Sequence, residues 1–226
     1  MNQHAGFNPR AQQNSNALSD FVVSDLRRAS PLIDAALASG MLKEKKNAEV
    51  FTKVANRNVD LVLHTGDSAP AISVVASVEN KSIMTAHGKA RKNRLGDLIA
   101  YSNHMHNHRR DCIAAGIIVV NLSAAYRNPD PFAKELRRAR FDAQKVVADT
   151  VRLFAAMPLR DEPHEPSDQP EALAVIVVDY DGIGEARLVT HIPAPQPTDV
   201  TFYENFIRRI AELYGKRFGL PPGTAG

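Results

Sequence analysis

The sequence predicts a mixed α/β fold (α+β in its order of elements) in which a mixed central sheet is flanked by helices. Short runs rich in β-branched residues, at 59–64 and 71–82, alternate with amphipathic segments of helical spacing. The run at 114–122 is almost continuously apolar, which favours a strand buried on both faces. The chain has 226 residues, 44% of them apolar, enough for one sizeable core.

The first elements are a tail followed by helices. Residues 1–16 are polar and include seven Asn or Gln, so we expect a disordered tail. Ser19 or Asp20 can cap the next helix, which is interrupted before Pro31. A further helix is expected over 42–56.

The middle of the chain predicts a hairpin, a helix and a central strand. The strands at 59–64 and 71–82 are separated by a turn sequence rich in Gly, Asp, Ser and Pro. Helical spacing of apolar residues follows from Leu95 to Met105 and leads into the strand at 114–122.

The later chain repeats this alternation. A helical stretch opens at Asp130 and ends near Phe154, and a Pro-rich loop occupies 157–172. An added C-terminal hairpin of strands at 174–179 and 186–192 follows, and then a last amphipathic helix from Phe202 to Leu213. We expect one domain over 17–220, with a core at about 40–123 and accessory elements at 124–220.

Composition gives only broad indications of the partners and the cellular compartment of the protein. The formal charge of +3 is compatible with a nucleic-acid partner but does not require one. The single cysteine, Cys112, excludes an internal disulfide and suits a reducing cytoplasm. No apolar run is long enough for a membrane span, and we expect a cytoplasmic protein without a membrane partner.

Three residues on the predicted hairpin carry the strongest chemical signal. Glu79 and Lys81 are two positions apart on one strand, so their side chains share a face. A register in which His64 opposes Val75 would place Asp60 directly opposite Glu79, which requires an asymmetric turn or a bulge. The less specific alternative is an exposed ion pair on an edge strand.

These residue types suit a hard metal ion. Asp60, Glu79 and the backbone carbonyl of Asn80 would offer oxygen ligands to Mg²⁺, with Mn²⁺ as a substitute. The ion would acidify a bound water and neutralise phosphate charge. Lys81 would orient the attacking water and stabilise the developing anion.

The pattern resembles the PD-(D/E)XK nucleases, the restriction-endonuclease-like superfamily. Val59-Asp60 stands for the first motif element, with valine where the motif name has proline, and Glu79-Asn80-Lys81 stands for the second. The resemblance covers about residues 40–123. It implies a restriction-endonuclease-like sheet, a metal-dependent nuclease activity and a further acid from the preceding helix, for which Glu49 is the best match.

A basic segment after this strand is the predicted nucleic-acid contact, although a solvated helix start is the plainer interpretation. Cations at a helix amino terminus oppose the macrodipole, which favours a ligand. The predicted contacts are Thr85, His87, Lys89, Arg91, Lys92, Asn93 and Arg94. The nearby His104, His106 and His108 invite a zinc interpretation, but phosphate contact or a solvated helix end fits the segment better.

The sequence therefore predicts a Mg²⁺-dependent endonuclease that hydrolyses phosphodiester bonds of duplex DNA, as in restriction of foreign DNA. Paired cuts at symmetric sites would make it a homodimer. Two alternatives stay open. The chain could be a noncatalytic DNA-binding or assembly module with this fold, or a nuclease for branched DNA or RNA.

Overall fold

The computed structural model describes residues 12–52, 55–66, 72–85, 87–126, 142–182 and 185–219. The helices are α1 (Gln12–Ala29), α2 (Pro31–Ala38), α3 (His87–His108), α4 (Ala143–Ala155) and α5 (Tyr203–Phe218). The strands are β1 (Lys43–Phe51), β2 (Asn56–Thr65), β3 (Ser73–Ile83), β4 (Ile113–Asn121), β5 (Ala172–Asp179) and β6 (Arg187–Leu188).

These strands form one mixed sheet in the order β1-β2-β3-β4-β5-β6. The pairs β1/β2, β2/β3 and β5/β6 are antiparallel, whereas β3/β4 and β4/β5 are parallel. A parallel step needs a crossover, and α3 and the segment containing α4 provide the two that are required. The predicted class, a mixed central sheet with flanking helices, is confirmed.

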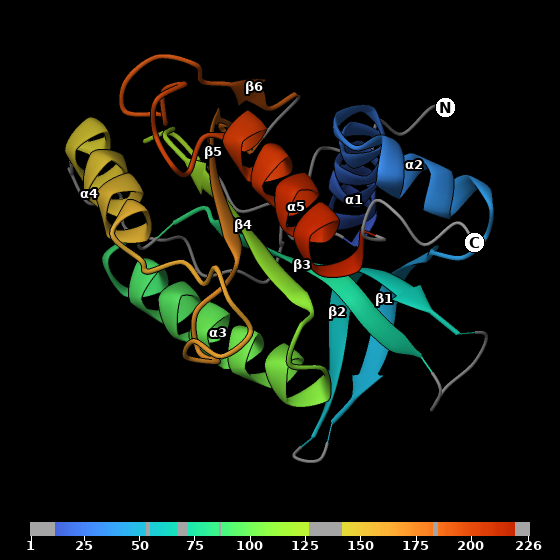
Figure 1. The fold of residues 1–226 in the computed structure, drawn as a ribbon. Helices are drawn as coiled ribbons and strands as arrows, with labels where there is room; N and C mark the ends of the chain where they lie inside the picture. Colours follow the sequence, from blue (N-terminus) through green and yellow to red (C-terminus); the bar gives the residue numbers. More distant parts are fainter. Residues whose placement is uncertain are drawn as a thin grey trace, which may run out of the picture.

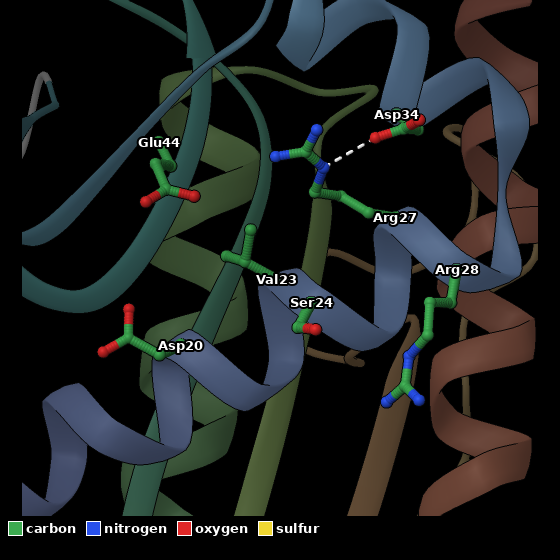
Figure 2. A pocket seen from close by; sticks show the side chains of 7 residues that line it. All are labelled: Asp20, Val23, Ser24, Arg27, Arg28, Asp34 and Glu44. Carbon is green, nitrogen blue, oxygen red and sulfur yellow. Dashed lines mark hydrogen bonds and ion pairs between the residues drawn. The ribbon is translucent and has the colours of Figure 1, made fainter.

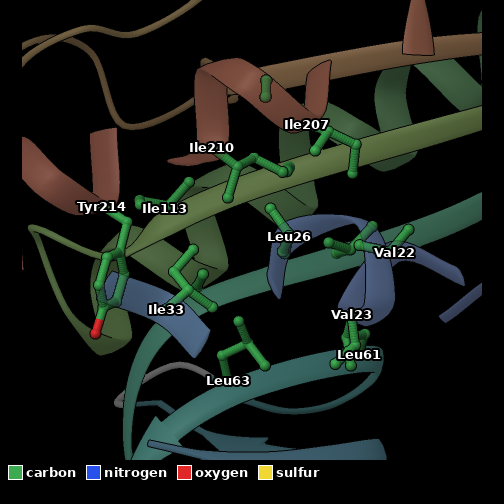
Figure 3. Packing of buried hydrophobic residues seen from close by; sticks show 14 of the residues in the cluster. Val22, Val23, Leu26, Ile33, Leu61, Leu63, Ile113, Ile207, Ile210 and Tyr214 are labelled. Carbon is green, nitrogen blue, oxygen red and sulfur yellow. The ribbon is translucent and has the colours of Figure 1, made fainter. Parts of the chain in front are cut away.

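Helices cover both faces of the sheet (Figure 1). α1, α2 and α5 lie on one face, where Leu26, Ile33 and Ile210 pack against Leu61 and Leu63 of β2 (Figure 3). α3 and α4 cover the other face with a second set of buried side chains. That set includes Leu98, Tyr101, Met105, Val147 and Phe154.

The central strand β4 has the burial that its apolar run predicted. Of its nine residues, only Val119 is partly exposed. Gly116 allows α3 to approach closely, because a Cβ atom there would lie 2.7 Å from Cδ2 of Leu98. The strand is therefore enclosed by helices on both faces.

Two N-terminal predictions are wrong. The helix expected over 42–56 is instead strand β1, in which Ala48 and Val50 are buried and Glu49 is exposed. The helix α1 begins at Gln12, so residues 12–16 are not a tail; residues 1–11 lie outside the described part. In both cases contacts with β2, which is distant in sequence from α1, determine the secondary structure. The polar local sequence does not indicate these contacts.

The C-terminal half belongs to the same cores as the first half. The predicted hairpin is present, although β6 covers only Arg187–Leu188 of the expected 186–192. α5 follows the predicted last helix, and it packs against α1 and β5. Of the predicted helix from Asp130, residues 130–141 lie outside the described part, and α4 accounts for its end. Within the described residues, no helix combines the length and apolarity needed to cross a bilayer.

Candidate active site

Strands β2 and β3 pair up to Leu61, next to Asp60, and the ladder does not include Asp60 and Glu79 themselves. Leu61 opposes Val78, one step before that position. The register then shifts after Leu63, so the ladder contains a bulge near the turn. The predicted opposition of His64 and Val75 is wrong, because beyond this bulge His64 pairs with Val74.

Strand β2 changes face at Asp60. Leu61 packs in the core under α1, whereas Val59 packs in the core under α3, although residues two apart share a face in a regular strand. In β1, Asn47 lies across from Asp60 with φ of 49°, a left-handed conformation that Asn tolerates better than most residues. The residues on either side of Asn47 and Asp60 are paired in the β1–β2 ladder, but these two residues are not.

This irregularity turns the Asp60 carboxylate toward the backbone of β3. Its Oδ2 atom accepts a hydrogen bond of 2.8 Å from the backbone N–H of Asn80. Its Oδ1 atom accepts one of 2.7 Å from the hydroxyl of Ser15 in α1. The backbone pairing of β2 with β3 ends at Leu61, and a side chain satisfies the next N–H group of β3.

Glu79 is buried beside two cations. Its Oε1 atom accepts hydrogen bonds from Nζ of Lys81 at 2.5 Å and from Nη2 of Arg57 at 3.2 Å. Its Oε2 atom has no hydrogen-bond partner among the described residues. The side chain of Glu79 is 4% exposed, whereas those of Lys81 and Arg57 are 23% and 26% exposed. The two cations stabilise the buried carboxylate and still reach solvent.

Arg57 also contacts Tyr101 of α3. Its guanidinium lies 5.5 Å from the ring centroid of Tyr101, within the range of a cation–π contact. The Tyr101 hydroxyl and the hydroxyl of Ser77 are 2.6 Å apart. Burial raises the pKa of Tyr101 well above its ordinary value, so the phenol stays neutral. Arg57 therefore stacks on an uncharged, anchored ring.

The two carboxylates of the predicted metal set have separate partners. Asp60 is bonded to Ser15 and Asn80, whereas Glu79 is bonded to Lys81 and Arg57. No group of three or more His, Cys, Asp or Glu side chains among the described residues is arranged to hold a metal ion. An ion at this position would rest on two carboxylates and an Asn oxygen.

Glu49 makes none of the contacts of this cluster, and the helix predicted to carry it is wrong, because the residue lies on strand β1. It lies on β1 opposite Asn58 and its side chain is exposed. The buried neighbours Ala48 and Val50 pack under α3, so the alternation of the strand turns Glu49 away from them. The helix that reaches Asp60 is α1, and it presents Ser15 there.

The basic segment forms the first turns of α3, which has no acidic residue in its first turn. Thr85 is partly exposed before the helix. His87 is buried, and its Nε2 atom lies 2.7 Å from the carbonyl oxygen of Asn121. Burial lowers the pKa of His87. The predicted phosphate contact of His87 is therefore corrected to a structural contact with the end of β4.

The other cations of this segment divide into two groups. Lys89 and Lys92 are exposed together with Asn93. Arg91 lies 4.0 Å from Asp149 of α4. Arg94 donates to the carbonyl of Ser82 and to Asp97, at 3.4 and 2.6 Å. Lys89, Lys92 and Asn93 are spaced to lie on one side of the helix and are exposed, whereas Arg91 and Arg94 are partly exposed and paired with acids.

The three histidines at the end of α3 contact different parts of the chain. His104 and His108 face the carbonyls of Val50 and Phe51 at 3.5 and 2.8 Å. His106 is buried between Ser167 and Glu171. Both of its ring nitrogens therefore lie close to oxygen atoms, Nδ1 at 2.7 Å from Ser167 and Nε2 at 2.9 Å from Glu171.

Glu171 is the centre of a second buried cluster of charges. Its Oε1 atom accepts from Arg160 at 3.0 Å and Arg217 at 2.9 Å. Its Oε2 atom accepts from the backbone N–H of Ala114 at 2.8 Å and from His106 at 2.9 Å. Both oxygens are satisfied, so this cluster ties the 156–171 segment and α5 to β4.

An open groove of about 600 Å³ is lined by α1, by Asp34 of α2 and by Glu44 of β1 (Figure 2). Arg27 and Asp34 form an ion pair of 2.6 Å across it. The groove also has acids on its wall, Asp20 and Glu44. Its lining mixes both signs of charge and includes none of the predicted site residues.

Comparison of the chain with protein-family models, with curated proteins and with solved structures found no match.

Two contributors to the cluster were not predicted from the sequence. Arg57 precedes Asp60 by three residues on β2, and a basic residue at the start of the same strand is a weak signal by itself. Ser15 lies 45 positions before Asp60, in a segment read as a tail. Nothing in the local sequence indicates its contact.

Proposed function

We propose that this chain is a Mg²⁺-dependent endonuclease of the PD-(D/E)XK type that hydrolyses phosphodiester bonds of duplex DNA, as in restriction of foreign DNA. The observation that carries the proposal is that Asp60 is bonded to the backbone N–H of Asn80, between Glu79 and Lys81, and that Lys81 contacts the Glu79 carboxylate. Glu79 is buried, yet one of its oxygens has no partner in the described part of the chain.

The side chains around Asp60 fit a hard cation in their chemistry. Oε2 of Glu79 is a buried oxygen without a hydrogen-bond partner among the described residues. A buried polar atom without a partner costs about 1–3 kcal/mol, which a bound ligand would recover. Asp60, Glu79 and the backbone carbonyl of Asn80 would hold the ion, because the Asn80 side chain points to the α1 side, where it contacts Ser15. Each carboxylate oxygen of Asp60 keeps a second lone pair for the ion. When bound, Mg²⁺ would neutralise phosphate charge and acidify a neighbouring water.

Lys81 and Arg57 would act on the substrate from the α3 side. Both ammonium and guanidinium groups are partly exposed and lie on the same oxygen of Glu79. Lys81 would orient the attacking water and stabilise charge that develops on the phosphate. Arg57 would remain on Glu79 when Lys81 turns to the substrate, so that the buried carboxylate keeps a counter-ion.

DNA would be held along the exposed start of α3. Lys89, Lys92 and Asn93 are exposed there, next in sequence to the strand that carries Glu79 and Lys81. Their contacts would be with phosphate oxygens, which position a duplex without reading its sequence. Two symmetric cuts would be made by two copies of the chain, so the proposal includes a homodimer.

A noncatalytic DNA-binding module is the second candidate. Both oxygens of Asp60 are occupied by protein donors, and Asp60 and Glu79 share no partner. A module of this kind would keep the exposed lysines of α3 and would need neither metal nor Lys81.

The decisive experiment measures cleavage of supercoiled, linear and branched DNA and of RNA with Mg²⁺. The variants Asp60→Ala, Glu79→Gln and Lys81→Met are compared with Glu49→Gln, an exposed acid on the neighbouring strand. We expect cutting of DNA by the wild type and by Glu49→Gln, and its loss in the other three. DNA binding without cutting by the wild type would favour the noncatalytic module. Cutting of only RNA or only branched DNA would contradict duplex DNA as the substrate.

A further inference from the structure

The first turns of α1 are docked on the irregular point of the sheet by polar side chains. The Ser15 hydroxyl donates to Oδ1 of Asp60 at 2.7 Å and accepts from Nδ2 of Asn80 at 3.1 Å. The backbone N–H of Asn80 donates to Oδ2 of Asp60 at 2.8 Å. Ser15, Asp60 and Asn80 therefore form a closed ring of three hydrogen bonds.

The direction of each bond in this ring is fixed by chemistry. A serine hydroxyl has one proton, and Asp60 is an acceptor when it is ionised, so Ser15 donates to Asp60. The amide nitrogen of Asn80 can only donate, so it donates to Ser15. As a result, both oxygens of Asp60 are held, one by α1 and the other by β3.

Neighbouring contacts fix the position of Ser15 itself. Ser19 is 1% exposed and its hydroxyl donates to the carbonyl of Ser15 at 2.9 Å. Asn47, the residue with positive φ in β1, donates to the side chain of Asn16 at 2.8 Å. The helix is thus attached to the same irregularity of β1 and β2 that turns Asp60 toward Asn80.

We infer that Ser15 is the positioning residue of Asp60, and that the start of α1 is part of the active centre. A catalytic role for Ser15 rests on the proposed nuclease function, whereas the hydrogen bond from Ser15 to Asp60 does not. It extends the site beyond the 40–123 segment that carries the sequence motif. A hydroxyl that orients a metal-binding carboxylate is a partner whose loss lowers metal affinity about 10–100-fold.

The first test needs neither metal nor activity. Exchange of the Asn80 backbone amide with solvent deuterium is measured by NMR in the wild type, Ser15→Ala, Ser15→Thr and Ser24→Ala. Ser24 is an exposed serine of the same helix and serves as the matched control. We expect roughly tenfold faster exchange in Ser15→Ala, wild-type exchange in Ser24→Ala and recovery in Ser15→Thr. Unchanged exchange in Ser15→Ala, or an equal increase in Ser24→Ala, would overturn the inference.

The second test measures Mn²⁺ binding by EPR with the same variants, after thermal melting has shown that each is folded. We expect Ser15→Ala to bind Mn²⁺ roughly tenfold more weakly than wild type. Equal or tighter binding would refute the positioning role, and tighter binding would mean that Ser15 blocks the carboxylate. A wild type that neither binds Mn²⁺ nor cuts DNA would refute the proposed function, while the exchange data would still decide whether Ser15 holds Asp60.

Discussion

Replacement of Glu171 by Gln should destabilise the protein strongly. The side chains of Glu171 and Arg160 are 0% exposed and that of Arg217 is 4% exposed. Gln keeps the shape of Glu171 but removes the one negative charge that faces both guanidinium groups and the ring of His106. Breaking a buried ion pair by removal of one partner costs about 3–5 kcal/mol. We expect a loss at the middle of that range, about 4 kcal/mol.

Thermal denaturation followed by circular dichroism checks this value. For a chain of this size 1 kcal/mol corresponds to about 2–4 °C, so Glu171→Gln should lower Tm by about 8–16 °C. Glu162→Gln is the matched control, because Glu162 pairs with Lys216 at the surface, where an ion pair contributes about 0–1 kcal/mol. A decrease in Tm for Glu171→Gln no larger than that for Glu162→Gln would refute the assigned role of the buried charges.

Three further outcomes are expected. Gly116→Ala places a methyl group against α3 and should cost about 1–3 kcal/mol in urea unfolding, whereas Gly96→Ala, in open space on α3, should stabilise by about 0.4–1 kcal/mol. Burial lowers the pKa of His87 from 6.5, so below about pH 6.5 the unfolded chain binds a proton that the folded chain excludes. The free energy of unfolding should therefore fall as pH drops from about 7.5 to 5.5, and less so in His87→Gln. If Lys89 and Lys92 contact phosphates, their joint replacement by Ala should reduce the slope of log Kd against log salt by about 1.8, and an unchanged slope would contradict this.

The sheet was predictable where the strand pattern is itself strong. β3 and β4 are rich in β-branched residues and lie within two residues of their predicted ends. β1 was not, because Lys43–Phe51 is dominated by charged helix formers and only Ala48 and Val50 mark its buried side. Its pairing with β2 overrides the local preference, as tertiary contacts often do.

The candidate site divides in the same way. Glu79 and Lys81 share a face because a strand alternates, and that follows from two positions of sequence. The direction of the Asp60 carboxylate depends on the break in the β1–β2 ladder at Asn47 and Asp60. It also depends on Ser15, which lies 45 residues earlier in the chain. Such contacts are set by three-dimensional packing, so no local pattern reports them.

The two buried glutamates, Glu79 and Glu171, differ in how their carboxylate oxygens are bonded. Each is paired with more than one cation, so burial and charge alone do not distinguish them. Both oxygens of Glu171 have protein donors, which is the arrangement expected of a carboxylate that stabilises a fold. Glu79 leaves one buried oxygen without a partner in the described chain, beside cations that reach solvent. Buried nitrogens of Arg160 and Arg217 in the Glu171 cluster also have no partner among the described residues, but they are donors and would not take a cation. The difference between the carboxylate oxygens is therefore the reason for proposing the chemistry at Glu79.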